Sequence, residues 1–420
     1  MAAMFLLSLV VAGLTSCAAG PSSRPHTLEV FQHRRALADR NSAVIIRAAE
    51  AAADRVAANP QALINVPYDG QEGFAEEHIN RAGGLANALP PDYREGELTT
   101  SDVALLSVRS WASDQVQVRA NIDPLRGSGS MIVLFASPAG LPPDLPADHL
   151  THNHAPSRRA EHAADNVIAN TLNSWLWVCE YSAALTRRGK HPGILLSILL
   201  PSADAFDRRM QGSREGRKFL GDCSTAIEPG ALSRQFLQRV DELILSLRSP
   251  RTRSQLEHAA ELIHHRLASG NTVAVTTNTH ILMSEIFENP RTAMKPFRCV
   301  GDARRAFAAN VGAGDIVLWI AYVGMNTPYE DYAGAMRRTG ADLITCFVPD
   351  RDPTNNAPDA IAHIDQAWMS PDAVVDVPFP PGRIAPISGL NEALLYRMLE
   401  DAVVAKSASA DLVPARASAR

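Results

Sequence analysis

The chain has 420 residues, of which 40 are Lys or Arg, 45 are Asp or Glu and 46% are hydrophobic. This composition excludes a disordered chain, and the net charge of −5 offers no basic surface to the backbone of a nucleic acid, so we expect no nucleic-acid partner. Five cysteines in a chain of this length exclude a fold that is held together by disulfides.

The first sixteen residues contain no charged side chain. Their apolar run, 5–14, is too short to span a bilayer, which needs about 20 residues, but it fits the hydrophobic region of a secretory signal. The sequence Leu-Thr-Ser-Cys that ends at Cys17 resembles the lipobox of bacterial lipoproteins, which implies lipidation of this cysteine. We therefore expect a protein outside the cytoplasm, periplasmic or at the cell surface, that is held at the membrane by a lipid only. Residues 1–4 lack the usual Lys or Arg, so the alternatives are a buried N-terminal strand or a miscalled start codon, which would make the protein cytoplasmic.

Hydrophobic periodicity predicts alternating helices and strands in the first half. In chain order, we predict a helix over 28–58, a strand at 63–66, a helix over 74–81, a buried strand at 131–136, a helix over 165–188, a buried strand at 193–200 and a helix over 232–247.

The second half has the same alternation. In chain order, we predict a helix over 251–268, a strand at 272–276, a helix over 281–288, a buried strand at 315–321, a helix over 327–339, and then strands at 341–348 and 373–377 before a helix over 386–405. Strands that alternate with helices indicate βαβ units and a doubly wound parallel sheet, so the fold class is α/β.

The two halves align as a duplication. Segment 63–70 corresponds to 272–279, 133–140 corresponds to 317–324, and 193–201 corresponds to 341–349. The difference in residue number between corresponding segments shrinks along the chain. The shrinking difference predicts about 36 extra residues in the first half, in the Pro- and His-rich stretch 138–162. Chance similarity between buried strands is the alternative. The resulting domains are a signal with tether at 1–25, a first unit with this insertion at 26–250, a second unit at 251–405 and a flexible tail at 406–420.

Three segments resemble the sugar isomerase (SIS) domain family, whose members bind phosphorylated sugars on a flavodoxin-like sheet. Residues 74–84 (FAEEHINRAGG) resemble the helix after the family's first sugar-phosphate loop. Residues 324–330 resemble its SGxN…E loop, and 374–382 resemble a VVID…PPG segment of single-domain members. The resemblance covers most of 26–405 as two tandem copies, and it implies two flavodoxin-like subdomains with three layers, α/β/α.

Candidate sugar or phosphate ligands lie in loops after predicted strands. Ligands of open parallel sheets bind beyond the carboxyl ends of the strands, where helix N-termini offer N–H groups to phosphate. The residues of these loops that fit this role are Ser137, Thr276, Thr277, Asn278, Thr279, Gly324, Asn326 and Thr327. The alternative is ordinary turn and N-cap chemistry. Two positions depart from the family, because Val323 replaces the usual serine and Asp69 in the first-half loop would repel a phosphate.

Aldose–ketose isomerisation needs a base that moves a proton between adjacent carbons and an acid at the carbonyl oxygen. The resemblance implies that the base is a glutamate on the helix after the first loop, which matches Glu76 or Glu77 in the first half and Glu285 in the second. His363 is a candidate for opening the sugar ring by its position alone. The alternatives are a solvated helix face for the glutamates and a surface or capping role for the histidine.

Four of the thirteen histidines fall between 149 and 162. His149, His152 and His154 have an HxxHxH spacing that could ligate a transition metal, but a polar surface loop is the alternative, and we expect no resident metal or cofactor.

We therefore predict a protein that binds a small-molecule sugar or sugar phosphate, with aldose–ketose isomerisation as its candidate reaction. The alternative function is a non-catalytic binding or scaffolding lipoprotein that has lost the sugar-phosphate site. The predicted helix over 28–58 and the sheet edges favour association either within the chain or between copies of it, and the second alternative would give a homo-oligomer.

Overall fold

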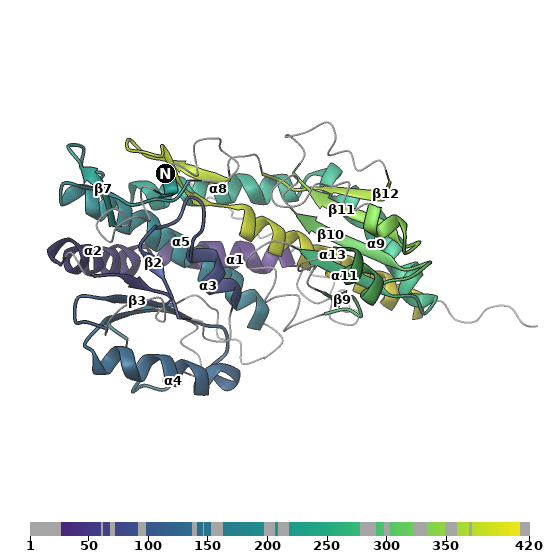
Figure 1. Ribbon diagram of the computed structural model, residues 1–420, viewed down its shortest axis with the longest axis horizontal. Helices are drawn as coiled ribbons and strands as arrows, with labels where there is room; N and C mark the ends of the chain where they lie inside the picture. Colours follow the sequence, from purple (N-terminus) through teal and green to yellow (C-terminus); the bar gives the residue numbers. More distant parts are fainter. Residues whose placement is uncertain are drawn as a thin grey trace, which may run out of the picture.

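The computed structural model of the chain shows two halves, each built on a five-stranded parallel sheet (Figure 1). The residues that it describes are 27–59, 62–67, 72–90, 98–136, 141–145, 147–152, 163–196, 206–208, 218–277, 291–297, 303–321, 334–348, 359–368 and 372–411.

The first sheet has the strand order β2-β1-β3-β4-β5. Its strands are β1 (Ile64–Asn65), β2 (Ala88–Leu89), β3 (Val103–Val108), β4 (Met131–Ala136) and β5 (His149–His152). This is the flavodoxin-like order. Every residue of β3 and β4 is buried, which explains their continuous apolar sequences, because a parallel sheet is covered on both faces.

The second sheet has the order β12-β11-β10-β8-β9, which is the same arrangement when its strands are counted along the chain. Its strands are β8 (Val273–Thr277), β9 (Lys295–Pro296), β10 (Ile316–Ala321), β11 (Asp342–Phe347) and β12 (Ala360–Asp365). Two sheets with one topology confirm the α/β fold class and the tandem repeat of a flavodoxin-like unit.

The strand equivalences that we predicted between the halves were wrong in part. The registers make Ile64 of β1 equivalent to Val273 of β8, and Val103 of β3 equivalent to Ile316 of β10. The difference in residue number between equivalent strands therefore stays at about 210, and β4 is equivalent to β11 instead of β10. The predicted extra residues arose from that wrong pairing, and the stretch 138–162 contains β5, a regular strand of the sheet. Buried strands share one apolar pattern, which predicts burial but carries no information on pairing.

The predicted helices of the described stretches are present. They are α1 (Thr27–Arg40), α2 (Ser42–Ala58), α3 (Glu72–His78), α5 (Ala163–Arg187), α8 (Ala231–Leu247), α9 (Pro250–Ala268) and α13 (Ser388–Asp411), to which the structure adds α4 (Trp111–Gly127) and α11 (Ala303–Asn310). The helix predicted over 28–58 is two helices that meet at Asn41. The helix predicted over 281–288 and the first part of that over 327–339 lie outside the described residues.

A layer of helices lies between the two sheets (Figure 1). One hydrophobic cluster joins Leu105 of β3 and Leu318 of β10 through α1, α2, α5, α8, α9 and α13. Helix α5 is buried along 167–186, so it runs through the interior of the molecule. Helix α4 covers the other face of the first sheet with Ile122, and α11 covers that of the second with Phe307. Within the described stretches, no helix combines the length and the apolar character that crossing a bilayer requires.

Two short two-stranded antiparallel sheets complete the halves. They are β6 (Lys190–Pro192) with β7 (Phe219–Asp222), and β13 (Ala373–Asp376) with β14 (Arg383–Pro386). The strand predicted at 373–377 therefore belongs to an antiparallel pair. Of the strand predicted at 193–200, only 193–196 is described, and there Ile194 forms an isolated antiparallel bridge with Leu85. Gly83 connects the halves: its N–H donates to the carbonyl of Leu195 at 2.8 Å, and its carbonyl accepts from the N–H of Ala385 at 2.9 Å. This connection holds the end of the α3 segment against the second half.

Candidate active site between the two halves

Helix α3 carries Glu77 into the interior, where its side chain is 0% exposed. Trp175 of α5 donates its indole N–H to Oε1 of Glu77 at 3.1 Å. The other oxygen, Oε2, lies 3.6 Å from Nε of Arg81 and has no hydrogen-bond partner among the described residues. One carboxyl oxygen of Glu77 thus accepts a hydrogen bond, and the other makes the longer ion pair with Arg81.

Arg81 links this part of the first half to the second half. Its Nη2 lies 2.8 Å from Oδ2 of Asp372 and also donates to the hydroxyl of Ser388. The Ser388 hydroxyl donates in turn to Asp372 Oδ2 at 2.8 Å. All three side chains are buried, so the guanidinium and the carboxylate form a closed ion pair between the halves.

The first turn of α13 packs directly on Glu77. A Cβ atom at Gly389 would lie 2.6 Å from Oε2 of Glu77, so only glycine leaves room for the carboxyl at this point. The positive end of the α13 dipole therefore faces Glu77. Glu392 lies one turn further along α13 and is 0% exposed. Neither carboxyl oxygen is in full hydrogen-bond geometry with a described residue, and the side chain of Gln366 acts on the carboxyl as a donor.

Three buried carboxyl groups share the single guanidinium of Arg81. Asp372 forms the close ion pair with it. Burial raises the pKa of Glu77 from its ordinary 4.5 to about 7, although Arg81 and the hydrogen bond from Trp175 lower it. Burial also raises the pKa of Glu392 well above its usual range, against the opposing charge of Arg81. A carboxyl that titrates near neutrality can both accept and donate a proton at physiological pH.

His78 is neutral and fixed in place. Its Nε2 lies 2.7 Å from the Ser174 hydroxyl, which itself donates to the carbonyl of Thr171, so Nε2 carries the proton and donates. Burial, followed by the charge of Arg81, lowers the pKa of His78 to about 3. The ring packs between Phe74 and Trp175, with centroids 5.0 Å and 4.8 Å away. This histidine supports the indole that binds Glu77.

The same end of α13 also reaches the carboxyl edge of the second sheet. Gln366, just beyond β12, donates its amide to the carbonyls of Cys346 in β11 at 3.0 Å and Ala321 in β10 at 3.3 Å. Asn391 of α13 accepts from the N–H of Ala367 at 3.3 Å. Ligands of open α/β sheets bind beyond such strand ends, so Glu77 and the expected ligand edge meet at the start of α13.

No model of a known protein family matches the sequence, and no curated protein matches it. Solved structures match over nearly the whole chain. The C-terminal domain of glucosamine-fructose-6-phosphate aminotransferase from Francisella tularensis gives a TM-score of 0.50 at 8% identity, and the match covers 92% of this chain and 98% of that one. A candidate phosphosugar isomerase from Clostridium difficile 630 gives 0.51 at 9% identity, over 91% and 93% of the two chains. The chain has the tandem SIS-domain fold.

A third SIS-type match has the highest identity of these three. This candidate sugar-binding protein from Salmonella typhimurium LT2 gives a TM-score of 0.50 at 12% identity, over 89% of this chain and 99% of that one. The fold that the sequence resemblance implied is therefore confirmed for both SIS units.

Of the two predicted glutamates that the structure describes, Glu77 is in the buried cluster. Glu76, its neighbour on α3, is half-buried. Glu285 lies outside the described residues. Successive positions of a helix point about 100° apart, which explains why only one of two adjacent glutamates faces Arg81.

His363 is on β12, the edge strand of the second SIS unit. Its Nδ1 lies 2.7 Å from the hydroxyl of Thr345, and its Nε2 lies 2.9 Å from Oδ1 of Asp365. Gln255 of α9 donates to the other oxygen of Asp365 at 2.9 Å. Both ring nitrogens thus have partners on β11 and β12, which indicates a structural role, and a part in catalysis stays an untested prediction.

The predicted sugar or phosphate ligands are described only in part. Thr276 and Thr277 are the last two residues of β8, at the carboxyl edge of the second sheet, and Thr276 is buried. The others lie outside the described residues: Ser137, Asn278, Thr279, Gly324, Asn326 and Thr327. The placement of β8 agrees with the expected position of a ligand loop and does not test the ligands themselves.

The histidine cluster has a different local structure from the surface loop that we considered. The backbones of His149 and His152 are in β5, and His154 lies outside the described residues, as does Cys17. Among the described side chains, no three His, Cys, Asp or Glu residues gather as a metal site.

Sequence reasoning missed most of the cluster around Glu77. Arg81 could have been found, because it follows Glu77 at the i, i+4 spacing of helical ion pairs. Asp372 is 291 residues from Arg81, and Glu392 is further still, so no local pattern signals them. Their proximity comes from the packing of one SIS unit on the other.

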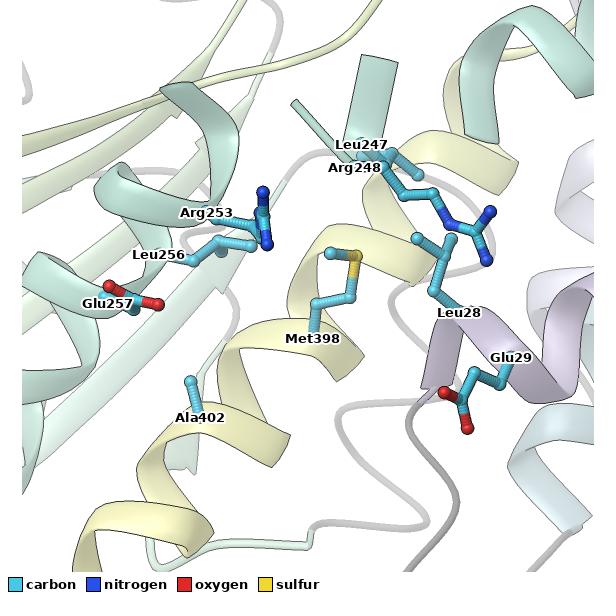
Figure 2. A pocket seen from close by; sticks show the side chains of 9 residues that line it. All are labelled: Leu28, Glu29, Leu247, Arg248, Arg253, Leu256, Glu257, Met398 and Ala402. Carbon is cyan, nitrogen blue, oxygen red and sulfur yellow. The ribbon is translucent and has the colours of Figure 1, made fainter. Parts of the chain in front are cut away.

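A surface pocket of about 230 Å³ lies between α1, α8, α9 and α13 (Figure 2). The side chain of Met398 lies in its middle, with Arg253 and Arg248 on opposite sides. It is lined by Leu28, Glu29, Leu247, Arg248, Arg253, Leu256, Glu257, Met398 and Ala402. None of these residues belongs to the Glu77 cluster, so this pocket is separate from the candidate active site.

Proposed function

We propose that this protein binds a phosphorylated sugar, or a related carbohydrate derivative, where its two SIS units meet, and interconverts the aldose and ketose forms. The observation that carries the proposal is the state of Glu77, a buried carboxyl with a near-neutral pKa and one oxygen held by nothing closer than the 3.6 Å ion pair with Arg81 among the described polar groups. Such a group can remove the proton from C2 of an aldose and return it to C1 of the enediol. One carboxyl therefore serves as base and then as acid.

The phosphate is expected at the ends of the second-sheet strands and not at Arg81. The guanidinium of Arg81 is already paired with Asp372, and two more carboxyl groups lie beside it. An anion would be repelled there when those groups ionise. Strand ends and helix N-termini offer backbone N–H groups without this repulsion. The site therefore has two regions, one for proton transfer at Glu77 and one for the phosphate near Thr276 and Thr277.

A non-catalytic binding or scaffolding protein is the second candidate function. The observation that favours it is the complete burial of Glu77, which has 0% exposure. Asp69 and Val323, which depart from the residues of the SIS family, favour it as well. Catalysis would require the substrate to reach a carboxyl that is closed to solvent.

The first experiment is a thermal shift series with hexose phosphates, amino-sugar phosphates and the corresponding free sugars, with inorganic phosphate as the control. We expect at least one sugar phosphate to raise the melting temperature more than inorganic phosphate does. The ligand is then incubated with protein in D₂O, and NMR measures exchange of its C2 proton. Exchange supports the isomerase, and binding without exchange supports a non-catalytic binding protein. Stabilisation by no sugar contradicts the isomerase and supports a scaffolding protein that has lost the site.

Replacing Gly389 with alanine is expected to reduce turnover by about 10- to 100-fold, because the new methyl group displaces the carboxyl of Glu77. Alanine favours a helix over glycine by about 1 kcal/mol. This gain should offset part of any decrease in the free energy of unfolding, whereas it does not restore the rate of turnover. The matched control is Gly127→Ala in α4, where a Cβ atom meets nothing within 4 Å. Steady-state rates and urea unfolding of both variants test this, and equal activity of the two would contradict it.

We also propose that Cys17 is lipidated and holds the protein at a membrane. The resemblance of the residues before Cys17 to a lipobox supports this. The Cys17→Ala variant is expected to move from the membrane fraction to the soluble fraction and to lose incorporation of labelled palmitate. Cys223→Ala, which removes a free thiol elsewhere, should leave both unchanged. A wild-type protein that is soluble and unlabelled would contradict the proposal.

A further inference from the structure

Glu392 is a buried carboxyl that the fold does not explain. It is 0% exposed, neither oxygen is in full hydrogen-bond geometry with a described residue, and the side chain of Gln366 acts on the carboxyl as a donor. Burying a polar group without a partner costs several kcal/mol in general, and native proteins keep such groups mainly where a ligand, a water molecule or a reaction uses them. The other buried carboxyl of α13, Glu400, differs in this respect because it is paired with Arg397.

The position of Glu392 on α13 directs it to the Glu77 cluster. It follows Gly389 and Ser388 by three and four residues, so the three residues share one face of the helix. Gly389 touches the carboxyl of Glu77, and Ser388 binds Asp372 and Arg81. The start of α13 therefore brings two partly unpartnered carboxyl groups to one place.

The charged and titratable groups that act on Glu392 come from both SIS units. They are Arg81 and Glu77 on the α3 segment of the first unit and Asp372 in the second unit. On the side of the second sheet is Cys346 of β11, whose pKa is raised by burial and then by Glu392. Glu392 thus lies between the proton-transfer region and the strand ends where the sugar phosphate is expected.

We propose that Glu392 is a second catalytic carboxyl, which gives a proton to the carbonyl oxygen of the substrate. This rests on the isomerase function proposed above. The C2–H bond of the aldose breaks and its proton passes to Glu77, while Glu392 protonates O1 to give a neutral enediol. Glu77 then returns its proton to C1, and Glu392 recovers a proton from O2. The ketose leaves, and both carboxyl groups are back in their starting states.

The test compares full-length wild type with Glu392→Gln on the sugar phosphate that the thermal shift series identifies. Glutamine keeps the shape and a hydrogen-bond donor but cannot transfer a proton. We expect kcat to fall by about 100- to 10,000-fold, with KM changed by less than about 3-fold. The kcat of wild type should also fall at alkaline pH as Glu392 loses its proton, and the variant should lack this decrease because glutamine does not titrate.

Glu400→Gln is the matched control, since it removes another fully buried carboxyl from the same helix. It should lower stability and leave kcat and the pH profile unchanged. Wild-type values of kcat and pH dependence in Glu392→Gln would overturn the role of Glu392 and leave the isomerase proposal intact. Binding without turnover by wild type would overturn proton transfer by both carboxyl groups. Neither binding nor turnover by wild type would overturn the proposed function itself.

Discussion

Glu77→Gln is expected to reduce turnover by at least about 100-fold and to leave the protein folded. The amide keeps the size of the carboxyl and an oxygen that can accept from Trp175, but it cannot take a proton from carbon. Substrate binding should persist, because the change removes no contact with the predicted phosphate region. The decisive measurement is exchange of the substrate C2 proton with D₂O, which should disappear with the net reaction. If Glu76→Gln and not Glu77→Gln abolishes exchange, the assignment of the base is wrong.

The same variant has a second consequence, for the pH dependence of stability. Folded Glu77 has a pKa of about 7, and the unfolded chain has the ordinary value of 4.5. Because the folded state holds this proton more tightly, its contribution to stability is present below pH 4.5 and is lost as the pH rises to about 7. The loss amounts to about 3 kcal/mol. Urea unfolding across this window should show the decrease in wild type, and Glu77→Gln should lack this part of it.

The sequence predicts elements of this fold better than it predicts their pairing. The strands β8, β10 and β11 were found because β-branched and apolar runs between helices are typical of a parallel sheet. The strands that were not predicted include β3, whose apolar run was overlooked, β5, and β12, an edge strand in which only Ala362 and Ile364 are buried. Half-exposed edge strands lack a continuous apolar run, and so they are the hardest to recognise from composition.

In the candidate site too, features set by neighbouring residues could be predicted from the sequence, and contacts with residues far along the chain could not. The motif around Glu77 identifies the helix and, through its spacing, Arg81. Whether Glu77 is a solvated residue or a buried acid depends on what covers it, and the cover comes from Trp175 on α5 and Gly389 on α13. The contact with Trp175 forms within the first unit, and the contact with Gly389 forms only when the second unit packs on the first. A raised pKa is therefore a property of the tertiary structure and has no signature in the sequence.

Arg81→Met is expected to lower the free energy of unfolding by about 3 to 5 kcal/mol. Its guanidinium lies 2.8 Å from Asp372, and both side chains are nearly closed to solvent, so the variant leaves an uncompensated buried carboxylate. The loss should appear in urea unfolding at neutral pH. It should be partly restored by adding Asp372→Asn, which removes the unpaired charge.

The matched control for this prediction is Arg35→Met, which breaks the ion pair of Arg35 on α1 with Asp241 on α8 at 2.6 Å. Asp241 is about half exposed there, so water solvates the remaining carboxylate and the loss should be below about 1 kcal/mol. Similar losses in the two variants would contradict the role given to the buried pair. Since the charge of Arg81 also lowers the pKa of Glu77, Arg81→Met should raise that pKa above 7 and move the pH at which turnover begins in the same direction. A structural ion pair and a catalytic pKa would thereby respond to one substitution, because both depend on how the two units pack around a single guanidinium.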